Sequence, residues 1–335
     1  LSVIAVIWHH TLGHQSGLPT WMGAGYHGVT LFFAISGFLI VTLLLREHES
    51  RGFIDLRAFY IRRALRIFPL YFAILALYIV LVASIERESP AGREFFKNLL
   101  SYATYTSNWF VTLDGRVIFY FAWSLAAEEQ FYLLWPSMER FVRPARAVGV
   151  MALVIAIVAI LLWVGPPAGG PVPLWFRMAT SIQLAICFGV VLAHLLHDER
   201  SYLWLKWLLG WRASGVVFLL AALWLSSWNE PSEIAVHLAF ALAVGACVYR
   251  EDHLLAPFLK WRIVSHLGSV SYGMYLLHML VKNSLGKGLS YAGLGDSPYL
   301  LFLLTVAATA VVATLSFRYF ESFFLRLKAT YSAPK

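Results

Sequence analysis

Ten stretches of the 335-residue sequence are apolar over a length close to the roughly 20 residues that an α-helix needs to cross a lipid bilayer. They lie at about 1–13 (a window that begins with the first residue), 26–45, 67–85, 117–137, 147–164, 174–196, 213–228, 234–249, 263–281 and 298–320. Several are apolar on every face, which is typical of helices surrounded by lipid or by other helices. Charged residues make up only 13% of the chain, against about 25% in soluble proteins, so they cannot cover a water-facing surface. We therefore predict an all-α fold: a single polytopic membrane domain of about ten transmembrane helices over residues 1–335.

The lysines and arginines between these windows predict how the bundle is oriented. Membrane proteins keep an excess of Lys and Arg in their cytoplasmic loops. If the first helix starts in the cytoplasm, the inner connections and the C-terminal tail hold 19 of these residues, and the outer connections hold 6. This bias predicts cytoplasmic loops at 46–66 and 197–212, external loops at 86–116 and 282–297, and both termini in the cytoplasm. We expect the aromatic-rich segment 95–112 to be interfacial or re-entrant.

The net charge of +8 follows from this topology and from contact with anionic lipid, so we expect the lipid bilayer, and no nucleic acid, as a partner. Cys187 and Cys247 lie far apart in apolar runs, which indicates two buried thiols rather than a disulfide. The motifs HExxH, GxxxxGK(S/T) and GxSxG are absent, which argues against a zinc protease, an NTPase and a serine hydrolase. We predict no bound metal and no permanently bound cofactor.

Ionisable residues inside the apolar windows are the main candidates for chemistry, because a charge buried in a membrane is costly. They are His9, His10, His27, Glu128, Glu129, His194, His237 and His278, with Arg177 near the start of a window. A carboxylate beside an imidazole orients a general base and stabilises its protonated form. Adjacent helix positions point about 100° apart, so Glu128 and Glu129 cannot share one partner equally. The alternative interpretation of the two carboxylates is a structural ion pair or hydrogen-bond clamp.

Three arginines cluster at the cytoplasmic entry of the window at 67–85. Helical spacing places Arg62 and Arg63 on the same side of the helix as Arg66. A guanidinium presents a fork of donors that suits phosphate oxygens. The cluster is therefore either a phosphate-binding site or a set of anchors placed by positive-inside insertion.

The segments that carry these residues follow a known pattern. WSLAAEEQFYLLWP (123–136) resembles the signature of the acyltransferase-3 family, membrane acyltransferases that O-acetylate bacterial polysaccharides and some antibiotics. In the family's order, GYHGVTLFFAISGFLI (25–40) is similar to its second-helix segment, FYIRRALRIFPLYF (59–72) to its arginine motif and SVSYGMYLLHM (269–279) to its late SYxxYLxH motif. LSVIAVIWHHT at the start resembles the first helix, whose catalytic histidine aligns with His10.

The resemblance implies a membrane-bound O-acyltransferase that moves an acyl group from acyl-CoA, with acetyl-CoA as the expected donor, to a hydroxyl of a carbohydrate-type acceptor. It assigns His10 as the general base that deprotonates the acceptor, with Glu128 or Glu129 supporting it. The three arginines would bind the phosphates of CoA at the cytoplasmic face of a bacterial cytoplasmic (inner) membrane. The other residues expected to line the site are His9, His27, Ser124, Gln130, Tyr272 and His278.

Of the two carboxylates, Glu128 is the expected partner of His10. Helical spacing puts Glu128 on a stripe with Ser124, whereas Tyr132 lies on the stripe of Glu129. The resemblance is the stronger ground, because some relatives carry a non-acidic residue at the second position.

Two other classes of protein stay open. A transporter or channel would explain many spans with buried ionisable groups, although not this combination of motifs. A non-catalytic membrane assembly or sensor protein would result if catalysis were lost. The sequence does not name the acceptor, the acyl chain length or the oligomeric state. The acceptor could be a polysaccharide, a peptidoglycan sugar, a lipid-linked sugar or a macrolide, and the arginine that the first-helix motif expects would precede Leu1.

Overall fold

The computed structural model describes the chain except for residues 14–22, 168, 229–231, 295–296, 330 and 332–335. All regular elements in the described part are helical, so the predicted all-α class is confirmed. Within that part, four helices are long and apolar enough to cross a membrane. The number rises to six if each of two pairs of helices bent at a short break counts as one span. The predicted count of about ten spans is not confirmed.

The chain forms two compact units, each described here by itself. The first unit comprises Leu1–Leu45 and Leu184–Arg318, and the second comprises Arg46–Gln183 and Tyr319–Lys335. Because one long helix runs from the first unit into the second, the chain leaves the first unit inside a helix rather than in a loop.

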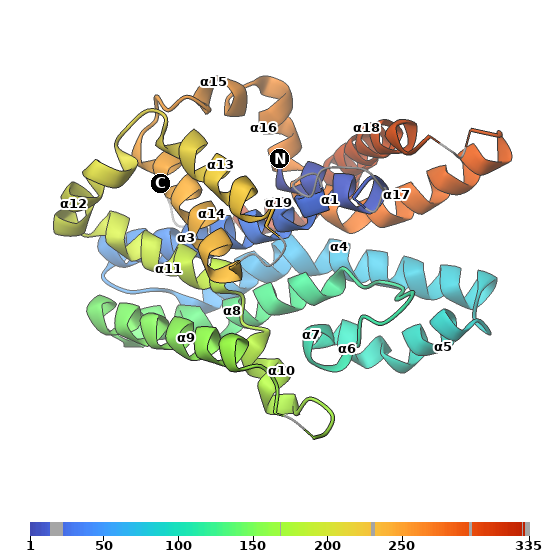
Figure 1. Ribbon diagram of the computed structural model, residues 1–335, viewed down its shortest axis with the longest axis horizontal. Helices are drawn as coiled ribbons and strands as arrows, with labels where there is room; N and C mark the ends of the chain where they lie inside the picture. The colour runs from blue at the N-terminus through green and yellow to red at the C-terminus, as the bar shows by residue number, and fades with distance from the viewer. Residues whose placement is uncertain (14–22, 168, 229–231, 295–296, 330, 332–335) are drawn as a thin grey trace. The chain divides into compact units, whose positions relative to one another are not determined.

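The first unit is a helical bundle formed by the start of the chain and by a second stretch that begins at Leu184. Its elements are α1 (Ser2–Thr11), η1 (Ala24–Tyr26), most of α3 (His27–Arg51), α11 (Leu184–His197), α12 (Glu199–Leu209), α13 (Ser214–Leu225), α14 (Glu233–Tyr249), α15 (Ala256–Leu259), α16 (Arg262–Ser269), α17 (Ser271–Tyr291) and α18 (Pro298–Ser316). The pairs α13–α14 and α17–α18 pack along their lengths, and α1 lies against α17, α18 and η1 (Figure 1).

Glycines allow the helices of the first unit to approach closely. A Cβ atom at Gly28 in α3 would overlap the carbonyl oxygen of Ser2 in α1. A Cβ atom at Gly37, further along α3, would overlap the carbonyl oxygen of Ile186 in α11. Small residues at such crossings are the usual way in which membrane helices bring their backbones together. They fix α1 beside the start of α3, which matters because both carry histidines.

The second unit contains α4 (Leu56–Ile85), α5 (Pro90–Lys97), α6 (Leu99–Ala103), α7 (Ser107–Phe110), α8 (Ala122–Phe141), α9 (Pro144–Val164), α10 (Leu174–Thr180) and α19 (Ser322–Ala329), with the end of α3 and most of the π-helical turn η2 (Phe317–Glu321). Much of the aromatic segment 95–112 falls in the short helices α5 to α7, which follow α4. The ring of Tyr71 in α4 stacks on Tyr105 with centroids 4.4 Å apart, and its hydroxyl donates to the carbonyl of Tyr102 at 2.8 Å. The segment is thus packed on α4.

Several predicted connections contain helix. The predicted external loop 282–297 is helical as far as Tyr291, as the end of α17, and residues 295–296 lie outside the described part. The predicted cytoplasmic loop 197–212 holds α12. The window at 174–196 is broken, because α10 and α11 meet at 44°. Hydropathy marks where apolar residues gather, whereas charged residues such as lysine favour a helix as well as apolar ones do.

Candidate functional site

The first unit brings four of the predicted site residues into one row of rings. The predicted base His10 stacks on His278 of α17, with centroids 5.5 Å apart and ring planes 22° apart. His10 also meets His9 edge-on at 5.0 Å. His9 meets Tyr26 at 5.6 Å, and Tyr26 meets His27 at 4.0 Å. We call these five residues the histidine chain.

Backbone carbonyls hold two members of the histidine chain that touch His10. His278 is fully buried, and its Nδ1 donates to the carbonyl oxygen of Tyr275 at 2.5 Å. Nδ1 of His9 donates to the carbonyl oxygen of Gly23 at 3.1 Å. A hydrogen bond at one ring nitrogen fixes which tautomer the imidazole adopts. His10 is therefore packed between two rings whose orientation the backbone sets.

The other end of the histidine chain leads to a residue that was not predicted for the site. His27 is buried at the start of α3, with its Nδ1 3.3 Å from the hydroxyl of Thr30. Its ring lies 6.0 Å from Phe240 of α14, and it interacts electrostatically with the buried His237 of the same helix. In the sequence, His237 is notable only as an ionisable residue inside an apolar window, and nothing links it to His27.

The second unit holds the two predicted carboxylates on α8. Glu128 is buried and accepts a hydrogen bond from the hydroxyl of Tyr132, one turn later. Helical spacing predicts that Tyr132 lies with Glu129, and this prediction is wrong. Helix side chains lean towards the N-terminus, so the long Tyr132 side chain reaches the residue four positions earlier. Ser124 is buried on the same helix, where its hydroxyl donates to the carbonyl of Phe121 at 3.0 Å.

Glu129 has different surroundings from Glu128. It is half-buried, and it interacts electrostatically first with the adjacent Glu128 and then with Arg63. It also interacts with the stacked tyrosines Tyr71 and Tyr105. The two adjacent carboxylates therefore interact with each other but differ in their other partners, because neighbouring helix positions point about 100° apart.

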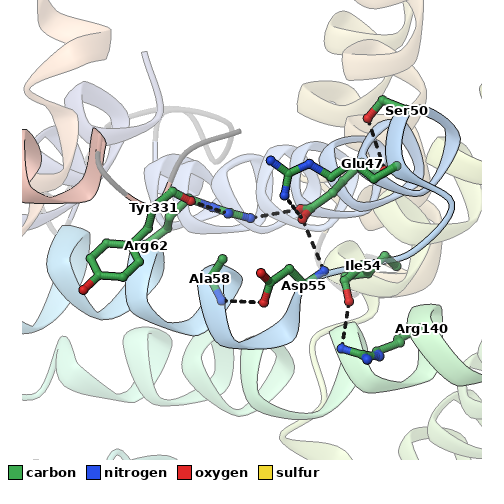
Figure 2. A network of polar contacts seen from close by, with 9 residues as sticks. Glu47, Ser50, Ile54, Asp55, Ala58, Arg62, Arg140 and Tyr331 are labelled. Atoms are coloured by element: carbon green, nitrogen blue, oxygen red, sulfur yellow. Dashed lines mark hydrogen bonds and ion pairs between the residues drawn. The ribbon is translucent and has the colours of Figure 1, made fainter. Parts of the chain in front are cut away.

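The three predicted phosphate-binding arginines diverge. The guanidinium of Arg62 donates to the Glu47 carboxylate at 3.0 Å and to the carbonyl of Tyr331 at 2.9 Å (Figure 2). The guanidinium of Arg63 lies over the ring of Tyr132, 4.1 Å from its centroid. Arg66 is half-buried, and neither it nor Arg63 makes a hydrogen bond or ion pair with another residue in the described ranges.

The last two predicted site-lining residues have different settings. Gln130 exchanges two amide hydrogen bonds with Asn108, at 3.0 and 2.9 Å, and donates to the carbonyl of Tyr105 at 2.8 Å. It ties α8 to the aromatic segment. Tyr272 is half-buried in the first turn of α17, the helix that carries His278. Among the described residues, no group of three or more His, Cys, Asp or Glu side chains is arranged to hold a metal ion.

The described residues thus form a helical fold with four to six helices or bent pairs long and apolar enough to cross a membrane, a histidine chain with two buried members in the first unit, and a buried carboxylate on α8 of the second unit. The sequence profile of the family described as "Acyltransferase domain" matches residues 1–317, which run through both units and hold every predicted site residue. The chain belongs to this acyltransferase family, and the predicted resemblance is confirmed.

Curated relatives match most of this chain. The O-acetyltransferase OatA of Staphylococcus aureus (strain NCTC 8325 / PS 47) is 26% identical over 343 residues, which cover 96% of this chain and 55% of that protein. The Bacillus subtilis (strain 168) protein named "Putative peptidoglycan O-acetyltransferase YrhL" is 27% identical over 333 residues, 90% of this chain and 50% of that protein. The chain thus spans about half the length of these relatives. No solved structure gives a significant match.

Proposed function

We propose that this protein is a membrane-bound O-acetyltransferase that moves an acetyl group from acetyl-CoA to a hydroxyl of a cell-wall polysaccharide. One observation carries the proposal: within an acyltransferase domain, His10 is stacked on a fully buried histidine that a backbone carbonyl holds. The relatives' names, which include O-acetyltransferase and peptidoglycan O-acetyltransferase, favour acetyl transfer to a polysaccharide.

In the proposed reaction, His10 is the general base. Its imidazole takes the proton of the acceptor hydroxyl as the oxygen attacks the carbonyl carbon of the thioester. The carbon–sulfur bond then breaks, and the leaving thiolate takes the proton from the imidazolium. The products are the O-acetyl ester and free CoA thiol, and His10 returns to its neutral form. A positioned base of this kind contributes about 10²–10⁴-fold to the rate.

The carboxylate of Glu128 would act on the charge that this step creates. An imidazolium forms transiently at His10, and a carboxylate partner stabilises such a cation. Glu128 is the better candidate of the two carboxylates because it is buried and already held by the Tyr132 hydroxyl. Glu129 is only half-buried.

The donor phosphates would bind at the arginines of α4. Among these, Arg63 and Arg66 have guanidinium donors that no described residue uses, so they are the first candidates for phosphate oxygens. Arg62 would have to release both Glu47 and the Tyr331 carbonyl before it could bind a phosphate fully.

The proposed topology has several spans, both termini in the cytoplasm and the arginines at the inner face. In this orientation, acetyl-CoA would reach the arginines from the cytoplasm. Single cysteines at positions 50 and 90 test this topology with a membrane-impermeant thiol reagent. Position 90 should react in intact cells and position 50 only after lysis; the reverse pattern would invert the proposed orientation.

The function itself is tested with purified protein in detergent or nanodiscs. Acetyl-CoA labelled in its acetyl group is added with isolated peptidoglycan, and label in the polysaccharide is counted before and after mild alkali. We expect alkali-labile label, as for an ester, together with one free thiol for each acetyl group transferred. Thiol release without label in peptidoglycan would contradict the proposed acceptor. No loss of acetyl-CoA with any hydroxyl acceptor would contradict the proposed donor.

A further inference from the structure

The three arginines of α4 have three different environments, although they occupy fewer than two helical turns. Arg62 is bound into a polar network with Glu47 and Tyr331 (Figure 2). Arg51 adds an ion pair with Glu47 at 3.7 Å. Asp55 caps α4 in the same network by accepting from the backbone N–H of Ala58 at 2.9 Å. Arg62 therefore holds the connection between α3 and α4.

Arg63 points to a different neighbour. Its guanidinium lies 4.1 Å above the ring of Tyr132, on α8. A cation over an aromatic face is attracted by the negative charge density of the ring. The contact leaves the N–H donors at the edge of the guanidinium available for another ligand, because it uses the flat face of the group.

Tyr132 uses its ring and its hydroxyl for different partners. The ring receives Arg63, and the hydroxyl donates to the carboxylate of Glu128. Tyr132 and Glu128 are both buried, so this hydrogen bond is shielded from water and fixes where the carboxylate oxygens lie. One side chain thus connects a candidate donor-binding cation to the carboxylate proposed to support the base.

We infer that Tyr132 is a positioning residue, which holds the Glu128 carboxylate through its hydroxyl and is itself held by Arg63 through its ring. The inference rests on the proposed function, because it assumes that Glu128 acts in acetyl transfer. It adds that binding of the CoA phosphates at Arg63 and the geometry of Glu128 are linked. Donor binding would then steady the carboxylate when it is needed.

The test compares the removal of the hydroxyl group from two tyrosines of the second unit, Tyr132 and Tyr60. Tyr132→Phe removes the bond to Glu128 and keeps the ring under Arg63. The control, Tyr60→Phe, removes a hydroxyl of α4 that donates to the backbone carbonyl of Leu133 in α8 at 2.7 Å and not to a carboxylate. Turnover is followed by thiol release with acetyl-CoA and isolated peptidoglycan, and acetyl-CoA affinity by equilibrium binding.

We expect Tyr132→Phe to lower kcat by about 10- to 100-fold, the rate equivalent of one hydrogen bond to a charged group. The affinity for acetyl-CoA should stay within about 2-fold, because the ring still supports Arg63, and Tyr60→Phe should change neither quantity by more than about 2-fold. A Tyr132→Phe protein with normal kcat would overturn the inference, as would an equal loss in both variants.

A double-mutant cycle tests the link between Arg63 and Tyr132. Arg63→Ala in the wild-type background should weaken acetyl-CoA binding and also lower kcat at saturating acetyl-CoA by about 5-fold or more. In the Tyr132→Phe background, the same change should weaken binding but leave kcat where it was. Equal effects on kcat in both backgrounds would overturn the link. If Tyr132→Phe does not fold, unchanged kcat in Arg63→Ala alone is enough to reject it.

These measurements distinguish failure of the positioning role of Tyr132 from failure of the proposed function. An active wild type with a fully active Tyr132→Phe variant rejects the positioning role and leaves the proposed function intact. A wild type that transfers nothing from acetyl-CoA rejects the proposed function, and the positioning role falls with it.

Discussion

The histidine chain of the first unit and the group Arg63–Tyr132–Glu128 of the second unit are built in opposite ways. The histidine chain consists of rings from three helices and one short turn, which contact one another by stacking and edge-on packing. In the second unit, one tyrosine makes a directed hydrogen bond with its hydroxyl and a cation contact with its ring. The geometry of the histidine chain depends on how closely the helices pack, whereas the geometry of the group Arg63–Tyr132–Glu128 depends on individual polar atoms.

This difference predicts how each region responds to change. Packing errors spread through a stack of rings, because closely packed interiors transmit small displacements. A directed hydrogen bond is lost when one oxygen is removed, even if the shape is kept. The histidine chain should therefore be sensitive to added volume, and the Glu128 region to isosteric loss of a polar group.

The largest expected effect is at the base. His10→Ala should lower the rate of acetyl transfer by about 10²–10⁴-fold, the contribution of a positioned general base. His9→Ala is the matched control on the neighbouring position, which faces about 100° away, and should lose roughly 10-fold or less. Rates are measured by thiol release with acetyl-CoA and isolated peptidoglycan. A dead His9→Ala with an active His10→Ala would move the base by one residue.

The next effect separates the two carboxylates. Glu128→Gln keeps the shape and removes the charge, so it should lower kcat by about 100-fold or more. Glu129→Gln should be milder, because Glu129 is only half-buried, whereas the buried Glu128 accepts the hydrogen bond from Tyr132. Initial rates at saturating acetyl-CoA give the comparison. If only Glu129→Gln is dead, the assignment of Glu128 is wrong; if both are active, the carboxylate has no part in the reaction.

The sequence predicted the all-α class, but it did not predict which neighbour each polar side chain contacts. The apolar windows located the helices, because apolar runs of this length have few other folds in a membrane. Tyr132 was placed with Glu129, since residues three and four positions apart are both neighbours on a helix. The lean of the side chain decides between them, and helical spacing does not contain that information.

The same limit applies to the arginines and to His237. Arg62 and Arg63 are adjacent, and a rotation of about 100° sends them to different partners that come from distant parts of the chain. Glu47 and Tyr331 could not be foreseen as partners of Arg62, because they lie outside the motifs. His237 lay in an apolar window, but its approach to His27 depends on how α14 packs.

Added volume at one glycine tests the packing half of the comparison. A Cβ atom at Gly28 would overlap the carbonyl of Ser2, so Gly28→Ala must push α1 away from α3. Overpacking costs about 1–3 kcal/mol of stability, and the shift of α1 should also disturb His10 and lower kcat by roughly 10-fold. Gly268→Ala is the control, since its Cβ atom would meet open space. Thermal unfolding and thiol release are measured together, and equal behaviour of the two variants would reject the packing argument.

The smallest expected effect concerns the donor. Arg66→Lys keeps the charge but loses the fork of donors, so the KM for acetyl-CoA should rise by about 5-fold with kcat nearly unchanged. Arg62→Lys should instead lower the thermal stability, because it breaks a network of two hydrogen bonds, and should change KM less. A larger KM effect at Arg62 than at Arg66 would mean that Arg62 leaves Glu47 to bind the donor.

The central claim of the proposed function is that His10 is the general base of acetyl transfer and that Glu128 supports it. A double-mutant cycle with His10→Ala, Glu128→Gln and their combination tests it most directly, with kcat for acetyl transfer as the measurement. Residues that act as a unit are strongly non-additive. We predict that the double variant is slower than the slower single variant by no more than about 3-fold. Losses that multiply, so that the double variant shows the full product of both single effects, would contradict the account.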